Sequence, residues 1–313
     1  MHGLSKNIVF TDEQAMLLDA ATVFCRDKAP IASVRAQMTT EHGFDRAVWD
    51  EMVALGWSGI AVPERFGGSG LSLAEVATIA EPMGRRLFAS PFGSTQIFVQ
   101  GALAGGSEAQ QADWLARVAS GAIATTAVLE PEGDWTLAHV EAVALREGGA
   151  LKLRGTKTLV SDAEVAALLM VSVTLDGAPA LVVLESSDLP ADALRRDVVV
   201  DGTRRACSLT LDGVGVPEDR LISGERAQAA LRALRDCALL LASAEAAGGI
   251  AGALDVMVEY LNTRTTFGRK IGSYQSLKHT CAELLVGLER SRSHLYHAAT
   301  LLNTAPEDFD RVM

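Results

Sequence analysis

Apolar residues recur at helical spacing over the first third of the chain, from Thr11 to about Ser120. The first such stretch begins with Thr11, whose hydroxyl suits a helix N-cap, and it ends before Pro30. Further amphipathic stretches follow, and the Gly-rich loop VPERFGGSGLS leads to Ser72, the next expected cap. The pattern predicts an N-terminal helical domain over residues 1–121.

The spacing of apolar residues changes near Ala122. From there to about Leu221 the chain consists of short segments rich in Val, Leu and Thr, separated by turn residues. Closely spaced strands without intervening helices are typical of an antiparallel sheet or a small barrel. We therefore expect a middle β domain over residues 122–222.

Helical spacing returns near Glu225. Residues 226–264 are expected to form one helix on the order of 55–60 Å long, and a second helix is expected from Tyr274 to about Leu302. Such lengths suit a helical bundle or an oligomer interface. A C-terminal helical domain over residues 223–313 completes a fold of the α+β class.

The most apolar stretch, CALLLASAEAAGGIAGALDVMV, lies within the first of these long helices. Glu245 and Asp255 interrupt it, so we expect a helix buried among other helices and no membrane span. The N-terminus has no apolar run like that of a signal peptide. The four cysteines form no CxxC motif, which favours reduced thiols and a cytoplasmic protein.

Size and charge narrow the classes of function. A chain of 313 residues suggests two or three domains. The formal net charge of −11 argues against a general nucleic-acid binder, because attraction to phosphates needs clustered Lys and Arg. A nucleotide ligand stays possible, since it needs only one local cationic patch.

The stretch RTTFGRKIGSYQSLKH, between the two long helices, offers such a patch. Arg264 falls in the last turn of the first helix, and Gly268 permits a sharp turn. Ser273 is expected to cap the second helix, whose free N–H groups favour an anion, and Gln275 follows in its first turn. These groups can hold a pyrophosphate and an adenine, but a cation that only complements the helix dipole fits Arg264 equally well.

The longer segment YLNTRTTFGRKIGSYQSLKH resembles the flavin-contacting signature of the acyl-CoA dehydrogenases, which is close to Y-x-x-x-R-x-Q-F-G-x-x-I-x-x-x-Q. Thr266 replaces the customary Gln, and the matching residues are Tyr260, Arg264, Phe267, Gly268, Ile271 and Gln275. LGWSGIAVPERFGGSGLS, LRGTKTLVSDA and LTLDGVGVPEDRLI resemble other segments of the same family. The resemblance covers essentially the whole chain.

The resemblance implies a cofactor and a reaction. FAD is expected between the β domain and the C-terminal helices, with no metal. A carboxylate would remove the α proton of an acyl-CoA thioester, and the β hydrogen would leave as hydride to flavin N5. Ser161 is expected to contact the flavin, and the turn between the two long helices is expected to supply further FAD contacts, namely Arg264, Phe267, Gly268, Ile271 and Gln275. Of these, Arg264 and Gln275 are expected to contact the FAD of an adjacent subunit.

The sequence departs from the family at several functional positions. The flavin strand, usually close to T-E-P-x-x-G-S-D, is LEPEGDW here, with Leu129 in the place of Thr and an added negative charge at Glu132. Ala238 and Leu239 stand where some members have a catalytic Glu and a CoA-binding Arg. Glu245 is then the candidate base, although an ion-paired helix acid explains it as well. Because the chain ends before the loop that more commonly carries the base, we expect the sequence to be truncated.

The family's usual functional residues are missing at Leu129, Ala238 and Leu239, whereas Arg264 and Gln275 are retained. This combination predicts the small-subunit type of a heteromeric acyl-CoA dehydrogenase, acting on dicarboxylyl or steroid side-chain CoA thioesters. A homo-oligomer, a non-catalytic subunit that completes a partner's FAD site, and a flavin monooxygenase or nitroalkane oxidase on the same fold are the alternatives. Arg204 and Arg205 either reach adenine or phosphate or lie in a solvated turn. His294 and His297 are spaced as metal ligands could be, but we expect them to be surface residues.

Overall fold

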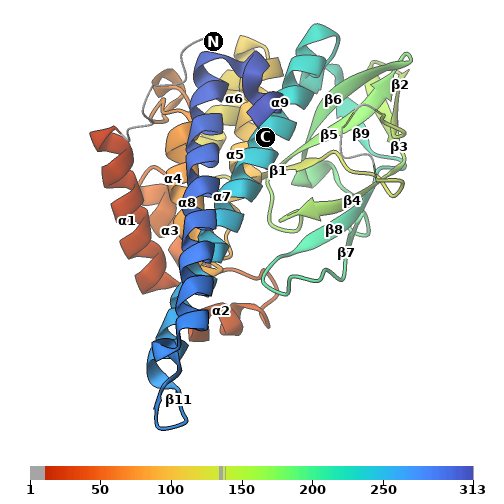
Figure 1. Ribbon diagram of the computed structural model, residues 1–313. Coiled ribbons are helices and arrows are strands. Elements are labelled where there is room, and N and C mark those ends of the chain that lie inside the picture. Colours follow the sequence, from red (N-terminus) through yellow and green to blue (C-terminus); the bar gives the residue numbers. More distant parts are fainter. Residues whose placement is uncertain (1–10, 134–136, 138, 313) are drawn as a thin grey trace. The chain divides into compact units, whose positions relative to one another are not determined.

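The structure is a computed structural model that describes residues 11–133, 137 and 139–312 (Figure 1). The chain forms two compact units, and each is described by itself. The first comprises Met1–Val34, Ser72–Phe88 and Leu239–Met313, and the second comprises Arg35–Leu71 and Ala89–Ala238. The division into three domains over residues 1–121, 122–222 and 223–313 stays a prediction.

The first unit is helical. Thr11 caps α1 by accepting a hydrogen bond from the Gln14 amide, and Ser72 caps α4 in the same manner through Ala74, so both expected caps are confirmed. The helices of this unit are α1 (Asp12–Lys28), the start of α2 (Ile31–Gln37), α4 (Leu73–Arg86), the second half of α7 (Glu225–Thr263), α8 (Gln275–Thr304), the short η5 (Pro306–Asp308) and α9 (Phe309–Val312).

A short hairpin joins α7 to α8 at one end of these two long helices (Figure 1). It consists of β11 (Thr265–Thr266), β12 (Arg269–Lys270) and the turn η4 (Ile271–Ser273). The predicted helix bounds are confirmed to within two residues, but the predicted cap is wrong. Ser273 lies in the η4 turn, where its hydroxyl donates back to the Lys270 carbonyl, and α8 begins after Tyr274 with no side-chain cap.

Glycines bring α4 and α7 into close contact. A Cβ atom on Gly84 would overlap the main chain of Glu245, and a Cβ atom on Gly248 would overlap the carbonyl group of Glu81. A Cβ atom on Gly252 would likewise crowd the carbonyl of Arg85. The two helix backbones therefore approach each other more closely than any residue larger than glycine allows at these positions.

The exposed side of α7 is also apolar. Among the described residues, α7 is the one helix that passes the length and composition test for a membrane span, and 39% of its most apolar window is buried. Ala244, Ala247 and Ala251 are buried, whereas Val256 and Tyr260 are exposed. The expectation of a buried helix thus holds for one face of α7 only.

The second unit contains the two larger sheets and the remaining helices. The helices are α3 (Arg46–Ala54), η1 (Glu64–Phe66), α5 (Phe92–Gly105), α6 (Glu108–Ala119), η2 (Ser186–Asp188), η3 (Glu218–Arg220), the end of α2 and the first half of α7. The strands are β1 (Ala124–Ala127), β2 (Val143–Glu147), β3 (Ala150–Arg154), β4 (Thr156–Ser161), β5 (Leu168–Leu175), β6 (Ala178–Glu185), β7 (Leu194–Arg196), β8 (Ala206–Thr210), β9 (Gly215–Pro217) and β10 (Leu221–Ile222).

The larger sheet has the order β10-β6-β5-β2-β3-β9, with β1 also paired to β5, and the smaller sheet has the order β4-β8-β7. The predicted antiparallel arrangement is confirmed for most pairs, but β1 and β2 each run parallel to β5. Parallel neighbours need a long connection, and the chain between β1 and β5, which includes β2, β3 and β4, supplies one. The two central strands β5 and β6 are buried along most of their length.

Candidate functional site

The hairpin between α7 and α8 holds the predicted cofactor contacts of the first unit. Thr266 pairs with Arg269, which leaves Phe267 and Gly268 as a two-residue turn. Both have positive φ, 52° and 75°, as in a type I′ turn. Glycine tolerates this conformation, but a phenylalanine in the left-handed region is uncommon and carries a conformational cost.

Phe267 and Arg264 both face solvent in this chain. The Phe267 side chain is 91% exposed. Arg264 is also exposed, and no hydrogen bond or ion pair of its guanidinium occurs among the described residues. Its cationic neighbours are engaged, since Lys270 donates to the Thr263 carbonyl at 2.7 Å and the Arg269 guanidinium lies 4.0 Å from the centre of the Tyr274 ring. Arg264 is thus the cation of the turn that is available for an anionic ligand.

The start of α8 adds polar groups beside this cation. Gln275 is the first residue of α8 and is exposed, with its amide nitrogen 3.2 Å from Nε2 of His279. Because no side chain caps α8, the N–H groups of its first turn are left for solvent or a ligand. Ile271 is half-buried under the turn. The five hairpin residues that the sequence singled out therefore lie together.

Ser161, the predicted contact from the β domain, ends β4 in the second unit. Its side chain is exposed, and its carbonyl accepts a hydrogen bond of 2.6 Å from the Thr125 hydroxyl. Leu159 and Asp162, on either side, have positive φ values of 52° and 56°. Left-handed backbone at two non-glycine residues marks this strand end as locally strained, which is common at functional sites.

Glu245, the candidate base, lies midway along α7 in the first unit and is half-buried. Its main chain packs against Gly84 of α4. It lies roughly 27 Å along the helix from the start of the hairpin, at 1.5 Å per residue. Glu245 and the hairpin of one chain therefore do not belong to one compact site.

The predicted departures from the family are seen in the second unit. Leu129 accepts a hydrogen bond at its carbonyl from the Thr158 amide, so its backbone is held although its side chain cannot donate. Glu132 is exposed. Asp236, a further acid of α7, forms an ion pair of 2.8 Å with Arg235, which makes it an unsuitable base.

Arg204 and Arg205 have different surroundings. The Arg205 guanidinium donates to the carbonyl groups of Met38 and Thr40 at 2.9 and 3.0 Å, so it fastens the segment after α2. Arg204 lies within 3.9 Å of Asp201 in its own turn. Arg205 is accordingly a structural residue rather than a ligand for phosphate or adenine.

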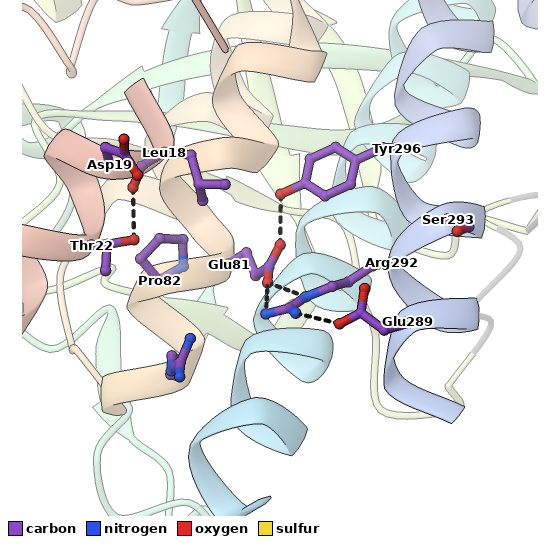
Figure 2. Close-up of a pocket in the computed structure, with 10 residues that line it drawn as sticks. Leu18, Asp19, Thr22, Glu81, Pro82, Glu289, Arg292, Ser293 and Tyr296 are labelled. Carbon is purple, nitrogen blue, oxygen red and sulfur yellow. Dashed lines mark hydrogen bonds and ion pairs between the residues drawn. The ribbon is translucent and has the colours of Figure 1, made fainter. Parts of the chain in front are cut away.

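A cavity of about 370 Å³ lies among α1, α4 and α8 of the first unit (Figure 2). At its inner side Glu81 accepts hydrogen bonds from Arg292 at 2.7 Å and from the Tyr296 hydroxyl at 2.6 Å. Glu289 takes the remaining side of the Arg292 guanidinium at 2.8 Å. Glu81, Arg292 and Glu289 thus satisfy one another's charges on this side of the cavity.

Burial and the negative charge of Glu81 raise the pKa of Tyr296 above its ordinary value, so this hydroxyl acts as a donor. Burial lowers the pKa of Arg292, but Glu81 and Glu289 outweigh that effect and raise it. The sequence analysis missed this network. The sequence pattern that could have indicated the network is Arg292 and Tyr296, four residues apart on α8, together with Glu81 in the apolar stretch that forms α4.

Within the described ranges 11–133, 137 and 139–312, no group of three or more His, Cys, Asp or Glu is arranged to hold a metal ion. His294 is exposed on α8, and His297 is half-buried one turn further on. The candidate ligand-binding residues are those of the hairpin and Ser161 at the end of β4.

Sequence profiles of one family match both ends of the chain. The profile of the acyl-CoA dehydrogenase N-terminal domain matches residues 11–122, and that of the acyl-CoA dehydrogenase C-terminal domain matches residues 222–312. Among curated relatives, acyl-CoA dehydrogenase IpdE2 of Mycobacterium tuberculosis is 27% identical over 94% of this chain and 79% of its own length. Mitochondrial isovaleryl-CoA dehydrogenase of Arabidopsis thaliana is 24% identical over 94% of this chain and 75% of its own.

Solved structures share the fold. The Tcur3481-Tcur3483 steroid ACAD G363A variant superimposes with a TM-score of 0.86 at 29% identity, covering 96% of this chain and 81% of that one. The ChsE4-ChsE5 complex from Mycobacterium tuberculosis gives a TM-score of 0.85 at 24% identity, covering 97% and 81%. The order of helices, β domain and long helices is thus that of a known class of flavoprotein oxidoreductases.

The chain belongs to the acyl-CoA dehydrogenase family. Members of this family carry out FAD-dependent dehydrogenation of acyl-CoA thioesters, and the chain is an oxidoreductase of that kind. Homologues form heteromeric complexes.

Proposed function

We propose that this chain is one subunit of a heteromeric acyl-CoA dehydrogenase, and that its hairpin completes the FAD site of a neighbouring subunit. The observation that carries the proposal is the strained, 91% exposed Phe267 beside the exposed guanidinium of Arg264, which has no partner among the residues that the structure describes. An exposed aromatic residue in an unfavourable backbone conformation is costly in an isolated chain. The cost is offset when a partner covers the hairpin.

Exposed apolar residues beyond the hairpin support the oligomer. Along the same two helices, Val256 of α7 is 67% exposed, and further apolar side chains project from α8, namely Leu284, Leu285 and Val286. Apolar surface of this kind marks protein–protein contact sites. A partner seated on α7 and α8 would thus lie beside the hairpin.

The chemistry of the hairpin fits an anionic dinucleotide. In a chain of net charge −11, Arg264 is an available cation next to the uncapped amides of α8 and the Gln275 amide. A guanidinium binds phosphate oxygens through two parallel hydrogen bonds, and an amide can both donate to and accept from an adenine edge. Bound FAD would accept the hydride that leaves the substrate's β carbon.

The proposal also assigns the catalytic base of this chain. A carboxylate must take the α proton of the thioester, and Glu245 is the candidate, because the positions of Ala238 and Leu239 carry no acid or cation. If Glu245 does not serve, the subunit assists catalysis through the hairpin alone and a partner supplies the base. Steroid-derived thioesters are the favoured substrates, since the solved structure at 29% identity is named a steroid enzyme.

Replacing Arg264 by alanine is expected to weaken FAD binding to the assembled protein by about 10- to 100-fold, since a charge-assisted hydrogen bond contributes about 1.5–3 kcal/mol. The test is co-purification with a homologous partner, removal of the flavin and titration with FAD. Absorbance of the bound flavin reports affinity and stoichiometry. Bleaching of the flavin by a panel of acyl-CoA thioesters then identifies the substrate.

Arg26→Ala is the matched control, because it removes an exposed guanidinium on α1 that pairs with the neighbouring Asp27. Its FAD affinity should equal that of the wild type. Equal affinity for the Arg264 and Arg26 variants would refute the role of the hairpin. If a Glu245→Gln variant binds flavin and the flavin is still bleached by the acyl-CoA thioester, Glu245 is not the base.

A further inference from the structure

A lysine with no exposed side-chain surface lies inside the β domain. Lys157 of β4 is 0% exposed, and its ammonium donates to Glu130 at 2.6 Å and to the Ser172 hydroxyl at 2.8 Å. Removing such a pair of charges from water is expensive. Apolar residues of similar size usually give equal or greater stability, so a buried pair is more readily explained by the geometry that it fixes.

Glu130 fixes the backbone on both sides of a connecting segment. Its two carboxylate oxygens accept hydrogen bonds of 2.7 and 2.8 Å from the amides of Glu141 and Ala142. Burial raises the pKa of Glu130, but the hydrogen bonds from Lys157 and from the two amides outweigh burial and keep it below its ordinary value. One ionised carboxylate therefore joins the chain after β1 to the chain before β2 and to β4.

The residues next to Glu130 are fastened to the same two strands. The Leu129 carbonyl accepts a 3.0 Å hydrogen bond from the Thr158 amide, directly after Lys157. The Ser172 hydroxyl, which also contacts Lys157, lies 3.4 Å from the Val128 carbonyl. The backbone over residues 128–130 is thus held against β4 and β5, independently of the side chain at position 129.

The strand that ends at Ser161 is strained and held at both ends. The pairing of β4 with β8 shifts register between Lys157 and Val160. Leu159 and Asp162 have positive φ. Lys157 anchors the strand before the irregular stretch, and Asp162 anchors it afterwards by accepting a 2.6 Å hydrogen bond from Ser94. Ser161 thus lies between two anchored residues of an irregular strand.

We propose that Glu130 and Lys157 are positioning residues that hold the backbone of Leu129 and the hydroxyl of Ser161 in place for a flavin ring bound by this chain's own β domain. The inference rests on the proposed function, and it deepens it. Leu129 cannot donate a side-chain hydrogen bond to a flavin. The hydrogen bonds that hold the backbone over residues 128–130 are nevertheless present. The chain therefore takes part in two flavin sites, one through its hairpin and one through β4.

The test is a double substitution, Glu130→Gln with Lys157→Met, in the assembled protein. It removes both charges together, so neither is left buried and unpaired. A glutamine at position 130 keeps one acceptor oxygen for the amides of Glu141 and Ala142, so we expect a moderately lower thermal unfolding midpoint, and the flavin is measured at a temperature at which the variant is fully folded. The FAD dissociation constant at the site formed by this chain's β domain should rise at least tenfold. The visible absorption and circular dichroism bands of the flavin that remains bound should shift, because the ring contacts change.

Two further variants sharpen the test. Ser172→Ala keeps the ion pair but releases its link to Val128, so we expect a smaller spectral shift in the same direction from a fully folded protein. Arg146→Met with Asp176→Asn removes an exposed ion pair of the same domain and should leave the flavin spectrum unchanged. This pair serves as the control for removing two charges.

The outcomes separate this inference from the proposed function. A wild-type complex that binds no flavin would overturn both. A wild-type flavin spectrum and stoichiometry in the folded double variant and in Ser172→Ala would overturn the positioning role alone. If the Arg264→Ala variant binds FAD normally while the double variant does not, the positioning role stands and the hairpin role falls.

Discussion

Replacing Gly248 by alanine is expected to destabilise the first unit by about 3 kcal/mol or more, at the upper end of the effects of overpacking. The added methyl group would overlap the Glu81 carbonyl and lie 2.7 Å from the Arg85 amide nitrogen. Both obstacles are backbone atoms of α4, which cannot turn aside as a side chain can. The helices α4 and α7 must therefore separate, and buried contacts along both are lost.

The adjacent glycine provides the control. A Cβ atom on Gly249 would lie 4.0 Å from the Gly84 carbonyl oxygen, which is ordinary van der Waals contact. Since alanine favours a helix by about 1 kcal/mol over glycine, Gly249→Ala should leave stability unchanged or raise it. Urea unfolding followed by circular dichroism measures both variants. Equal midpoints for the two would mean that α4 and α7 do not pack as described.

The glycine contact also bears on the candidate base. Glu245 lies three residues before Gly248, and its main chain faces Gly84. A variant that separates α4 from α7 would displace Glu245 together with its helix. The proposed proton transfer should therefore be more sensitive to Gly248→Ala than FAD binding at the hairpin. The hairpin begins roughly 27 Å from Glu245 along α7, at 1.5 Å per residue.

Local patterns were sufficient to predict the elements. Thr11 and Ser72 cap the helices that follow them, and both long helices have nearly the predicted bounds, because caps and apolar periodicity act over a few residues. The predicted cap at Ser273 failed for an equally local reason. The residues after β12 form a single short turn, and that turn uses the Ser273 hydroxyl for itself.

The hairpin cluster was predictable because its residues are close in the chain. Arg264, Phe267 and Gln275 lie within one turn and its flanking helices, so adjacency in sequence ensures adjacency in space. The parallel pairing of β1 with β5 was not predictable in this manner. It depends on which strands meet after a long excursion of the chain, and alternating side-chain patterns do not report the direction of a neighbouring strand.

The buried polar pairs were beyond sequence reasoning. Glu81 contacts Arg292 and Tyr296 across 211 and 215 residues of sequence, and Lys157 contacts Glu130 across 27. An acid in an apolar helix face and a lysine in a strand are each unremarkable alone. Their meaning comes from burial, which leaves each charged group dependent on the partner that the fold brings to it.

For Glu81 that dependence can be measured. Glu81→Ala is expected to cost about 3–5 kcal/mol of stability, because it leaves the Arg292 guanidinium partly buried without its main carboxylate and the Tyr296 hydroxyl without its acceptor. Tyr296→Phe removes only the hydrogen bond from the tyrosine hydroxyl to Glu81 and should cost about 1–2 kcal/mol. Glu289→Ala removes an acid that is 57% exposed on the same arginine, so it should cost at most about 1 kcal/mol.

The order of these three variants decides what holds α8 against α4. Denaturant unfolding should rank them Glu81→Ala, Tyr296→Phe, Glu289→Ala, from most to least destabilised. If Glu81→Ala and Glu289→Ala were equally mild, water would be solvating Arg292 in place of Glu81, and the cavity in Figure 2 would be an open ligand-sized pocket. If Glu81→Ala alone is severe, the buried carboxylate is the group on which the contact between the two helices depends.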